Sequence, residues 1–282
     1  MTVIVASGSF DDLRSRHVRF LQEASRLGDL HVLLWSDELI RRLTGRPPKF
    51  PQAERQYLIE AIRYVSRTTL VTELDSADVL PAAALQTAAP QETIWAVDEA
   101  DDAPARRTFC AGRGIGYRVL AAAELAGFPA DEGERSEARG QRSEIGRPSV
   151  VVTGCYDWLH SGHVRFFEEA ASYGDLIVVV GNDATVRHLK GEGHPLQTQE
   201  ERRYMVAAIR YVRLALISSG WGWLDAEPEI RRLKPDIYLV NEDGDRPEKR
   251  AFCAAHGLRY VVLKRVPKEG LPRRSSTELR GY

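Results

Sequence analysis

The chain contains two copies of one sequence pattern, and this repeat limits the folds that it can adopt. HVRFLQEASRLGD, which begins at His17, matches HVRFFEEAASYGD, which begins at His163, at eight of 13 positions. AIRYV then occurs once in each half. Further on, Ile94–Cys110 (IWAVDEADDAPARRTFC) pairs with Ile237–Cys253 (IYLVNEDGDRPEKRAFC). Three matched blocks in the same order indicate a duplication, so the 282 residues should form two similar domains.

A charged segment separates the two copies. In Asp131–Pro148 (DEGERSEARGQRSEIGRP) nine of the 18 residues are charged. Burial in such a segment cannot offset the entropy lost on ordering it. We therefore predict a first domain at residues 1–130, a flexible linker at 131–148 and a second domain at 149–282.

Each half alternates short β-branched runs with helical spacing. VIVAS (3–7) and VVVTG (150–154) read as strands that end at a turn containing glycine. In the second half, further strands are expected at 176–180, 214–218, 237–240 and 260–263, and helices at about 164–171, at 200–211 and before Lys234. This order predicts an α/β protein of two tandem Rossmann-like domains, each with a doubly wound parallel sheet. Ligands of such sheets bind beyond the carboxyl ends of the strands.

Composition excludes several classes of protein. The 39 basic and 40 acidic residues nearly cancel, which argues against nucleic-acid binding by bulk charge. The apolar runs are far shorter than a membrane span, and the N-terminus does not resemble a signal peptide. Three cysteines are too few for a disulfide framework. We expect a soluble cytoplasmic protein.

The turn after the first strand of the second half carries the candidate chemistry. It reads GCYDWLHSGH and places His160 and His163 in the first turn of a helix, where free N–H groups and the dipole favour an anion. Gly162 lets a phosphate approach the backbone. Surface or capping histidines are the alternative reading. A zinc pair lacks a visible third ligand, so we predict no metal site.

This turn resembles the HxGH signature of the cytidylyltransferase-like nucleotidyltransferases. GDLIVVVGNDATVRHLKGEG resembles the second strand and lysine-bearing loop of that family, EERRYMVAAIRYV its arginine-bearing helix, and RRSSTELR its closing Ser/Thr motif. The resemblance covers nearly all of the second half and implies the HxGH nucleotidyltransferase fold. The tandem layout resembles phosphoethanolamine cytidylyltransferases.

The resemblance implies attack by a substrate phosphate on the α-phosphate of a nucleoside triphosphate, with release of pyrophosphate. It assigns catalytic roles to His160, His163 and Lys190. The nucleotide-binding residues that it implies are Gly154, Cys155, Tyr156, Asp157, Gly162, Arg274, Ser275, Ser276 and Thr277, with Arg265 and Arg273 as alternatives to Arg274.

Other residues are candidates for binding the acceptor. They are Asp183, Arg202, Arg210, Trp221, Trp223 and Glu242. A solvated helix face is the alternative for Arg202, a helix cap for Asp183, and loop packing for the tryptophans, which could also stack on a base or cage a quaternary ammonium.

The nucleotide and the acceptor are not fixed by these motifs. The tandem form favours CTP, whereas VVGNDATVRHLKGEGHP resembles sugar-phosphate (heptose) adenylyltransferases and favours ATP. The acceptor would be a phosphorylated polyol, sugar or amino alcohol. Mg²⁺ is expected to enter with the triphosphate. A non-catalytic nucleotide-binding or scaffold protein is the alternative of another class.

The first half has lost the groups that would bind phosphate. Arg14 stands in place of His160, Arg16 in place of Gly162 and Thr44 in place of Lys190, and no RRSST follows. We expect a degenerate, catalytically silent copy, in which the side chain of Arg16 fills the space of the phosphate. The two halves are predicted to pair as an intramolecular pseudo-dimer, and the chain could oligomerise further.

Overall fold

The computed structural model describes residues 2–82, 92–129 and 146–279. They form two compact units, Met1–Gly127 and Phe128–Tyr282. Most of the expected linker, 131–148, lies outside the described residues, so its flexibility stays a prediction.

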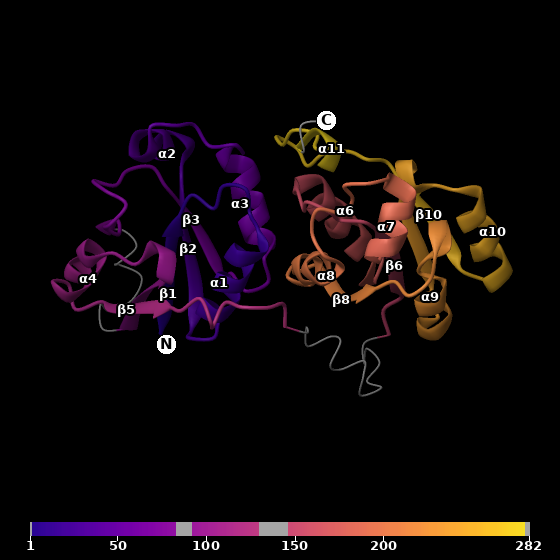
Figure 1. Ribbon diagram of the computed structural model, residues 1–282, viewed down its shortest axis with the longest axis horizontal. Helices are drawn as coiled ribbons and strands as arrows, with labels where there is room; N and C mark the ends of the chain where they lie inside the picture. The colour runs from indigo at the N-terminus through magenta and orange to yellow at the C-terminus, as the bar shows by residue number, and fades with distance from the viewer. Residues whose placement is uncertain (1, 83–91, 130–145, 280–282) are drawn as a thin grey trace. The chain divides into compact units, whose positions relative to one another are not determined.

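The first unit (Figure 1, indigo to magenta) contains five strands and four α-helices in its described part. They are β1 (Val3–Gly8), α1 (Ser15–Ser25), β2 (Asp29–Trp35), α2 (Asp37–Thr44), α3 (Gln52–Ala61), β3 (Arg67–Val71), β4 (Thr93–Asp98), α4 (Pro104–Ala111) and β5 (Gly116–Leu120).

The second unit repeats this order (Figure 1, pink to yellow). Its elements are β6 (Ser149–Gly154), α6 (Ser161–Ala171), β7 (Asp175–Val180), α7 (Asp183–Lys190), α8 (Gln199–Ala207), β8 (Val212–Ile217), η4 (Gly222–Leu224), α9 (Glu227–Leu233), β9 (Ile237–Asn241), η5 (Glu242–Gly244), α10 (Pro247–His256), β10 (Arg259–Leu263) and α11 (Ser276–Leu279).

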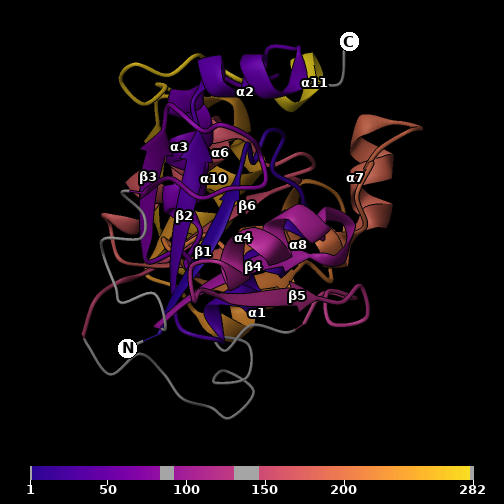
Figure 2. The ribbon, with the colours of Figure 1, turned by 90° about the vertical axis from the view of Figure 1, so that its left-hand side faces the viewer.

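Both sheets are parallel and share one topology. The strand order is β3-β2-β1-β4-β5 in the first unit and β10-β9-β6-β7-β8 in the second. Neighbouring strands such as β2 and β3 run side by side (Figures 1 and 2). In each unit the chain starts at the central strand, builds one side of the sheet, and then crosses to the other. The crevice between β6 and β9 is therefore the topological switch point. The predicted fold class is confirmed.

Local sequence explains most element boundaries. The run LIVVV makes β7 a buried strand, with only its first residue, Asp175, partly exposed. Asn182 and Thr198 cap α7 and α8 by accepting the amides of Thr185 and Glu201. Helix α8 ends at Ala207, four residues earlier than expected, because the chain turns there to enter β8.

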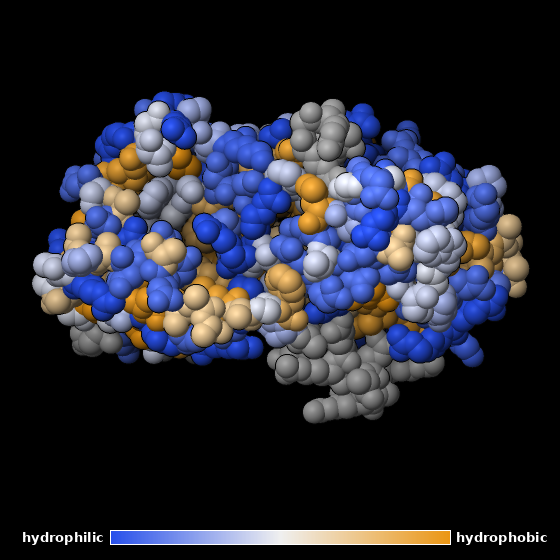
Figure 3. Space-filling model, viewed as in Figure 1, coloured by the Kyte–Doolittle hydropathy of each residue, from blue (hydrophilic) through white to orange (hydrophobic). Residues whose placement is uncertain are grey.

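The surface carries no broad apolar face in the view of Figure 3. Hydrophilic residues dominate both units there, and hydrophobic residues form small separate patches. Within the described residues, no helix is both long and apolar enough to span a bilayer.

Candidate active site

The turn between β6 and α6 has a constrained backbone. Tyr156 and Trp158 have positive φ angles of 53° and 75°, which side chains other than glycine disfavour. A Cβ on Gly154 would lie 2.7 Å from the ring of Tyr156, so only glycine fits there. The carboxylate of Asp157 accepts the amides of Leu196 (2.9 Å) and Gln197 (3.0 Å), which ties the turn to the loop before α8.

The two signature histidines lie together at the start of α6. Their rings stack, with centroids 3.9 Å apart. His160 is the N-cap, and its Nδ1 accepts the amide of Gly162 at 3.1 Å. The capping reading of the sequence is therefore correct for this nitrogen. It also leaves the proton of a neutral ring on Nε2.

Burial and neighbouring cations keep both rings neutral. Burial, then the charges of Arg265 and Arg274, lowers the pKa of His160 to about 3. The pKa of His163 lies well below its usual value, through burial, His160, Arg265 and Lys190. Nε2 of His160 and Nδ1 of His163 have no hydrogen-bond partner among the described residues. Buried nitrogens without partners are rare and suit a ligand that supplies oxygen atoms.

A cavity of about 270 Å³ opens at the carboxyl ends of β6 and β9. It brings His163 and Lys190 together with the turn residues Gly154, Cys155 and Tyr156. The other lining residues that matter below are Thr153, Gly181, Trp223, Asp225, Asn241, Asp243, Lys249 and Ser276. Lys190 is the last residue of α7, so it projects from a helix end and not from a loop.

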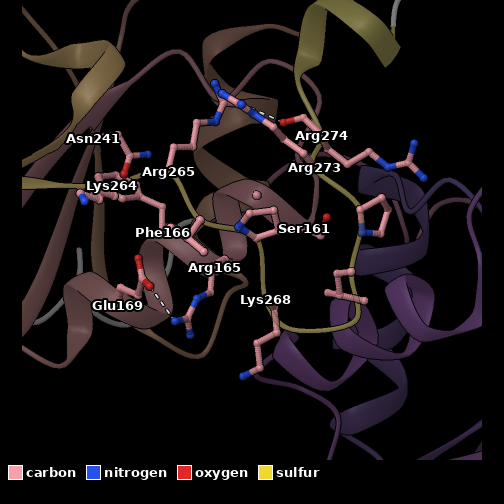
Figure 4. Close-up of a pocket in the computed structure, with 15 residues that line it drawn as sticks. Ser161, Arg165, Phe166, Glu169, Asn241, Lys264, Arg265, Lys268, Arg273 and Arg274 are labelled. Atoms are coloured by element: carbon pink, nitrogen blue, oxygen red, sulfur yellow. Dashed lines mark hydrogen bonds and ion pairs between the residues drawn. The ribbon is translucent and has the colours of Figure 1, made fainter.

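A smaller, basic cavity of about 20 Å³ adjoins the start of α6 (Figure 4). Arg273 and Arg274, which precede α11, and Arg265, which follows β10, lie around this helix end. Arg265 donates to the carbonyl of Arg274 at 2.8 Å and pairs with Asp243 at 2.9 Å. Arg265 and Arg274 also lower the pKa of His160, so their charges reach the histidine pair.

The closing Ser/Thr motif caps the last helix. The Ser275 hydroxyl accepts the amide of Glu278 at 3.2 Å, so Ser275 is the N-cap of α11. Ser276 lines the larger cavity. The side chain of Thr277 lies outside the described residues.

Arg202 occupies a different place from the one expected. It is fully buried, and its guanidinium donates to the carbonyls of Gln197, Cys155 and Gly181 and to Asp183. These bonds hold the ends of β6 and β7, and neither Arg202 nor Asp183 lines the cavity. A solvated helix face is therefore wrong for Arg202, and the expected substrate contact stays a prediction.

The remaining candidates for binding the acceptor do not gather at the cavity. Of Arg210, Glu242, Trp221 and Trp223, only Trp223 lines it. Arg210 precedes β8 and thus lies at the amino edge of the sheet, opposite the cavity. The Glu242 carboxylate accepts a hydrogen bond from the backbone amide of Arg265. Asp243 lines the cavity, and Glu242 does not. Trp223 lines the cavity, whereas Trp221 packs against the ring of His188 outside the lining, with the ring centroids 4.8 Å apart. Arg246 covers one face of Trp223 at 4.5 Å, which disfavours an ammonium cage there.

Sequence reasoning missed two charged residues of the cavity, Asp225 and Lys249, both largely buried. Lys249 lies in the third repeated block, opposite Arg106 of the first half. A basic residue retained at this position in both copies was an available signal.

The first unit keeps an open cavity at the equivalent place. About 230 Å³ lies at the ends of β1 and β4, lined by Phe10, Arg16 and His17 among others. Arg16 lines this cavity and its Nε lies 3.4 Å from Nε2 of His17, the counterpart of His163, so the expectation that its side chain fills the phosphate site stays a prediction. Thr44 ends α2 as Lys190 ends α7, which confirms their equivalence.

Comparisons with known proteins agree with this geometry. Residues 151–281 match the family model "Cytidylyltransferase-like". The bifunctional protein HldE of Aliarcobacter butzleri (strain RM4018) is 42% identical over 74 residues, 26% of this chain and 16% of that protein. HldE of Alkalilimnicola ehrlichii is 37% identical over 156 residues, 52% of this chain and 29% of that protein. The chain thus spans less than a third of the length of these relatives.

A solved structure, the lipopolysaccharide core biosynthesis protein from Thermoplasma volcanium GSS1, is 24% identical, with a TM-score of 0.38, and covers 44% of this chain and 100% of that one. The HxGH turn, the stacked histidines and the family match identify one half of the chain. Residues 151–281 belong to the cytidylyltransferase-like family of nucleotidyltransferases.

Proposed function

We propose that the second unit transfers a nucleoside monophosphate from a nucleoside triphosphate to a small phosphomonoester and releases pyrophosphate. One observation carries the proposal: His163 and Lys190 line the same cavity, and the paired imidazoles are neutral and have ring nitrogens without partners. Such groups suit phosphate oxygens, and the cations around them suit a polyanion.

The reaction needs positioning more than it needs a base. A phosphomonoester is largely an anion at neutral pH, so its oxygen can attack the α-phosphorus directly while the bond to pyrophosphate breaks. His160 Nε2–H and His163 would donate hydrogen bonds to the phosphates as charge moves to the leaving group. Lys190 would bring the attacking phosphate and the α-phosphate together, and Arg265 and Arg274 would bind the outer phosphates. Mg²⁺ would enter on the triphosphate and offset part of its charge.

We favour ATP over CTP and a sugar phosphate as the acceptor. The segment GNDATVRHLKGEGHP, which resembles sugar-phosphate adenylyltransferases, contains Lys190 and runs toward the loop that Asp157 holds. The two relatives named above are HldE proteins, and this agrees with the adenylyl alternative better than with CMP transfer. Because the chain spans only part of those relatives, the substrates remain our proposal.

A coupled pyrophosphate assay tests the function. The full chain should release pyrophosphate from ATP and Mg²⁺ only when a phosphomonoester is present, and more slowly from CTP. If pyrophosphate were released from CTP and a phosphomonoester but not from ATP and the same phosphomonoester, the reaction would be cytidylyl transfer. Binding of either nucleotide without pyrophosphate release, across sugar, polyol and amino-alcohol phosphates, would make the chain a nucleotide-binding protein instead.

A further inference from the structure

The larger cavity contains a second set of polar groups, of which only Tyr156 belongs to the phosphate motifs. They are Thr153 from β6, Tyr156 from the turn, Asp225 before α9 and Lys249 from α10. All but Thr153 are at least nine-tenths buried, so only a small ligand inside the cavity can reach them. The larger nucleotide can instead contact Arg265 and Arg274, which line the adjoining basic cavity.

Lys249 is a buried cation without an ion pair among the described residues. It is 6% exposed, and its ammonium contacts the Thr153 hydroxyl at 3.4 Å and the Tyr238 ring at 5.7 Å. Asp225 and Asp243 attract it electrostatically, but neither forms an ion pair with it. A buried charge left in this way is costly unless a ligand supplies the missing partner.

The first unit shows what this position looks like when the protein supplies the partner. Arg106, the counterpart of Lys249, also lines a cavity. Its Nε donates to Asp78 at 2.9 Å and its guanidinium to the carbonyl of Asp101 at 2.7 Å. The cation is therefore held by protein groups in the first unit and left for a ligand in the second.

Two further groups complete the set. Tyr156 lines the cavity, and its hydroxyl is buried and has no hydrogen-bond partner within the described part of the chain. Asp225 accepts the Ser218 hydroxyl at 2.7 Å through one oxygen and also lines the cavity. Lysine and tyrosine donate to ligand oxygens, and the carboxylate accepts from a ligand hydroxyl. An ammonium group would instead meet the positive charge of Lys249.

Building on the proposed function, we infer that Lys249, Tyr156 and Asp225 form the subsite for the carbon chain of the acceptor. This subsite selects phosphomonoesters with hydroxyl groups, such as sugar and polyol phosphates, and rejects those that carry an ammonium group. Lys249 determines this specificity. Phosphorylated amino alcohols, which the sequence analysis had allowed as acceptors, are therefore excluded.

The test combines kinetics with stability in the full chain. The acceptors are glucose 1-phosphate, ribitol 5-phosphate, glycerol 3-phosphate and phosphoethanolamine. K249Q should raise the KM of a hydroxylated acceptor about 10- to 100-fold, the scale of one lost hydrogen bond to a charged group, and leave the KM of the nucleotide within about twofold. K249Q should also lower the ratio of kcat/KM for hydroxylated acceptors to kcat/KM for phosphoethanolamine. K249R, which keeps the positive charge, should lower this ratio less.

Stability separates this role from a structural one. K249Q and Y156F remove buried groups that have little or no protein partner, so the unliganded protein should melt at the same or a higher temperature while the acceptor KM rises. The matched control is R106Q in the first unit, which should lower the melting temperature and leave both KM values unchanged.

Binding of the acceptor alone, measured by calorimetry, decides the inference even if no pyrophosphate is released. Tighter binding of a hydroxylated phosphomonoester than of phosphoethanolamine, weakened by K249Q, would support the subsite and leave only the proposed reaction refuted. Preference for phosphoethanolamine, a K249Q effect confined to the nucleotide, or binding of none of the four acceptors would overturn it.

Discussion

The imidazole rings of His160 and His163 stack with their planes inclined by only 23° and their centroids 3.9 Å apart. Two charged rings at this distance would repel each other, and Lys190, Arg265 and Arg274 add to that repulsion. The unliganded site therefore carries its positive charge on lysine and arginine and keeps the histidines as neutral hydrogen-bond donors. A bound triphosphate would offset the surrounding positive charge and raise both pKa values.

Replacement of His163 should act on the chemical step. H163A is expected to lower kcat by about 10²–10³, the cost of losing one preorganised donor to developing charge. Steady-state pyrophosphate release measures this. H17A, at the equivalent position of the first unit, is the control and should leave kcat unchanged. An H163A effect on KM alone would mean that the ring binds the ground and transition states equally.

Acid should destabilise the unliganded protein in a histidine-dependent way. Burial lowers the pKa of His160 to about 3 and that of His17 to about 4, whereas both are near 6.5 in an unfolded chain. The unfolded state then binds more protons than the folded state below about pH 6.5, so stability falls as the pH falls toward 4. Urea midpoints between pH 7.5 and 4.5 should show this fall.

The same series of urea midpoints identifies the residues that cause the loss of stability in acid. H160N should flatten the pH dependence of the transition assigned to the second unit, and H17N that of the first. Slopes equal to those of the unaltered protein would show that other groups control the acid response.

Arg202 should stabilise the fold and leave the chemistry to other residues. R202M removes a buried guanidinium that bonds three carbonyls and Asp183, and should lower the free energy of unfolding of the second unit by about 3 kcal/mol. R55M should do the same in the first unit, because Arg55 bonds Phe50, Ser9, Trp35 and Asp37 in the same way. Urea unfolding measures both. Unchanged stability with a raised KM would instead support a substrate role for Arg202.

The two exposed tryptophans should behave differently. Trp223 lines the cavity and Trp221 does not, although Trp221 is the more exposed, at 60% against 46%. W223A should raise the KM of the nucleotide or of the acceptor about tenfold. W221A is the control at the neighbouring tryptophan and should change both KM values less than twofold. Equal effects would mean that both contact the substrate.

The repeat made much of the fold predictable. Matched blocks located equivalent turns, and the helices α1 and α6 that follow them have equal length. The roles of single side chains were harder to predict, because helical spacing does not reveal what an arginine reaches across a sheet edge. Arg55 and Asp11 nevertheless carried a signal. The first copy keeps them after losing its phosphate-binding groups, which is expected of residues that hold the turn. Their counterparts Arg202 and Asp157 do so in the second unit.

The backbone of the turn has a further consequence. Phe10 and Asp12 adopt positive φ angles of 45° and 55°, as Tyr156 and Trp158 do in the other copy. The first copy thus retains a main-chain shape that its own residues disfavour. After the duplication, the side chains of the turn changed while its main-chain conformation was kept. Restoring a working cradle to the first unit would accordingly require new side chains on a main chain that is already in place.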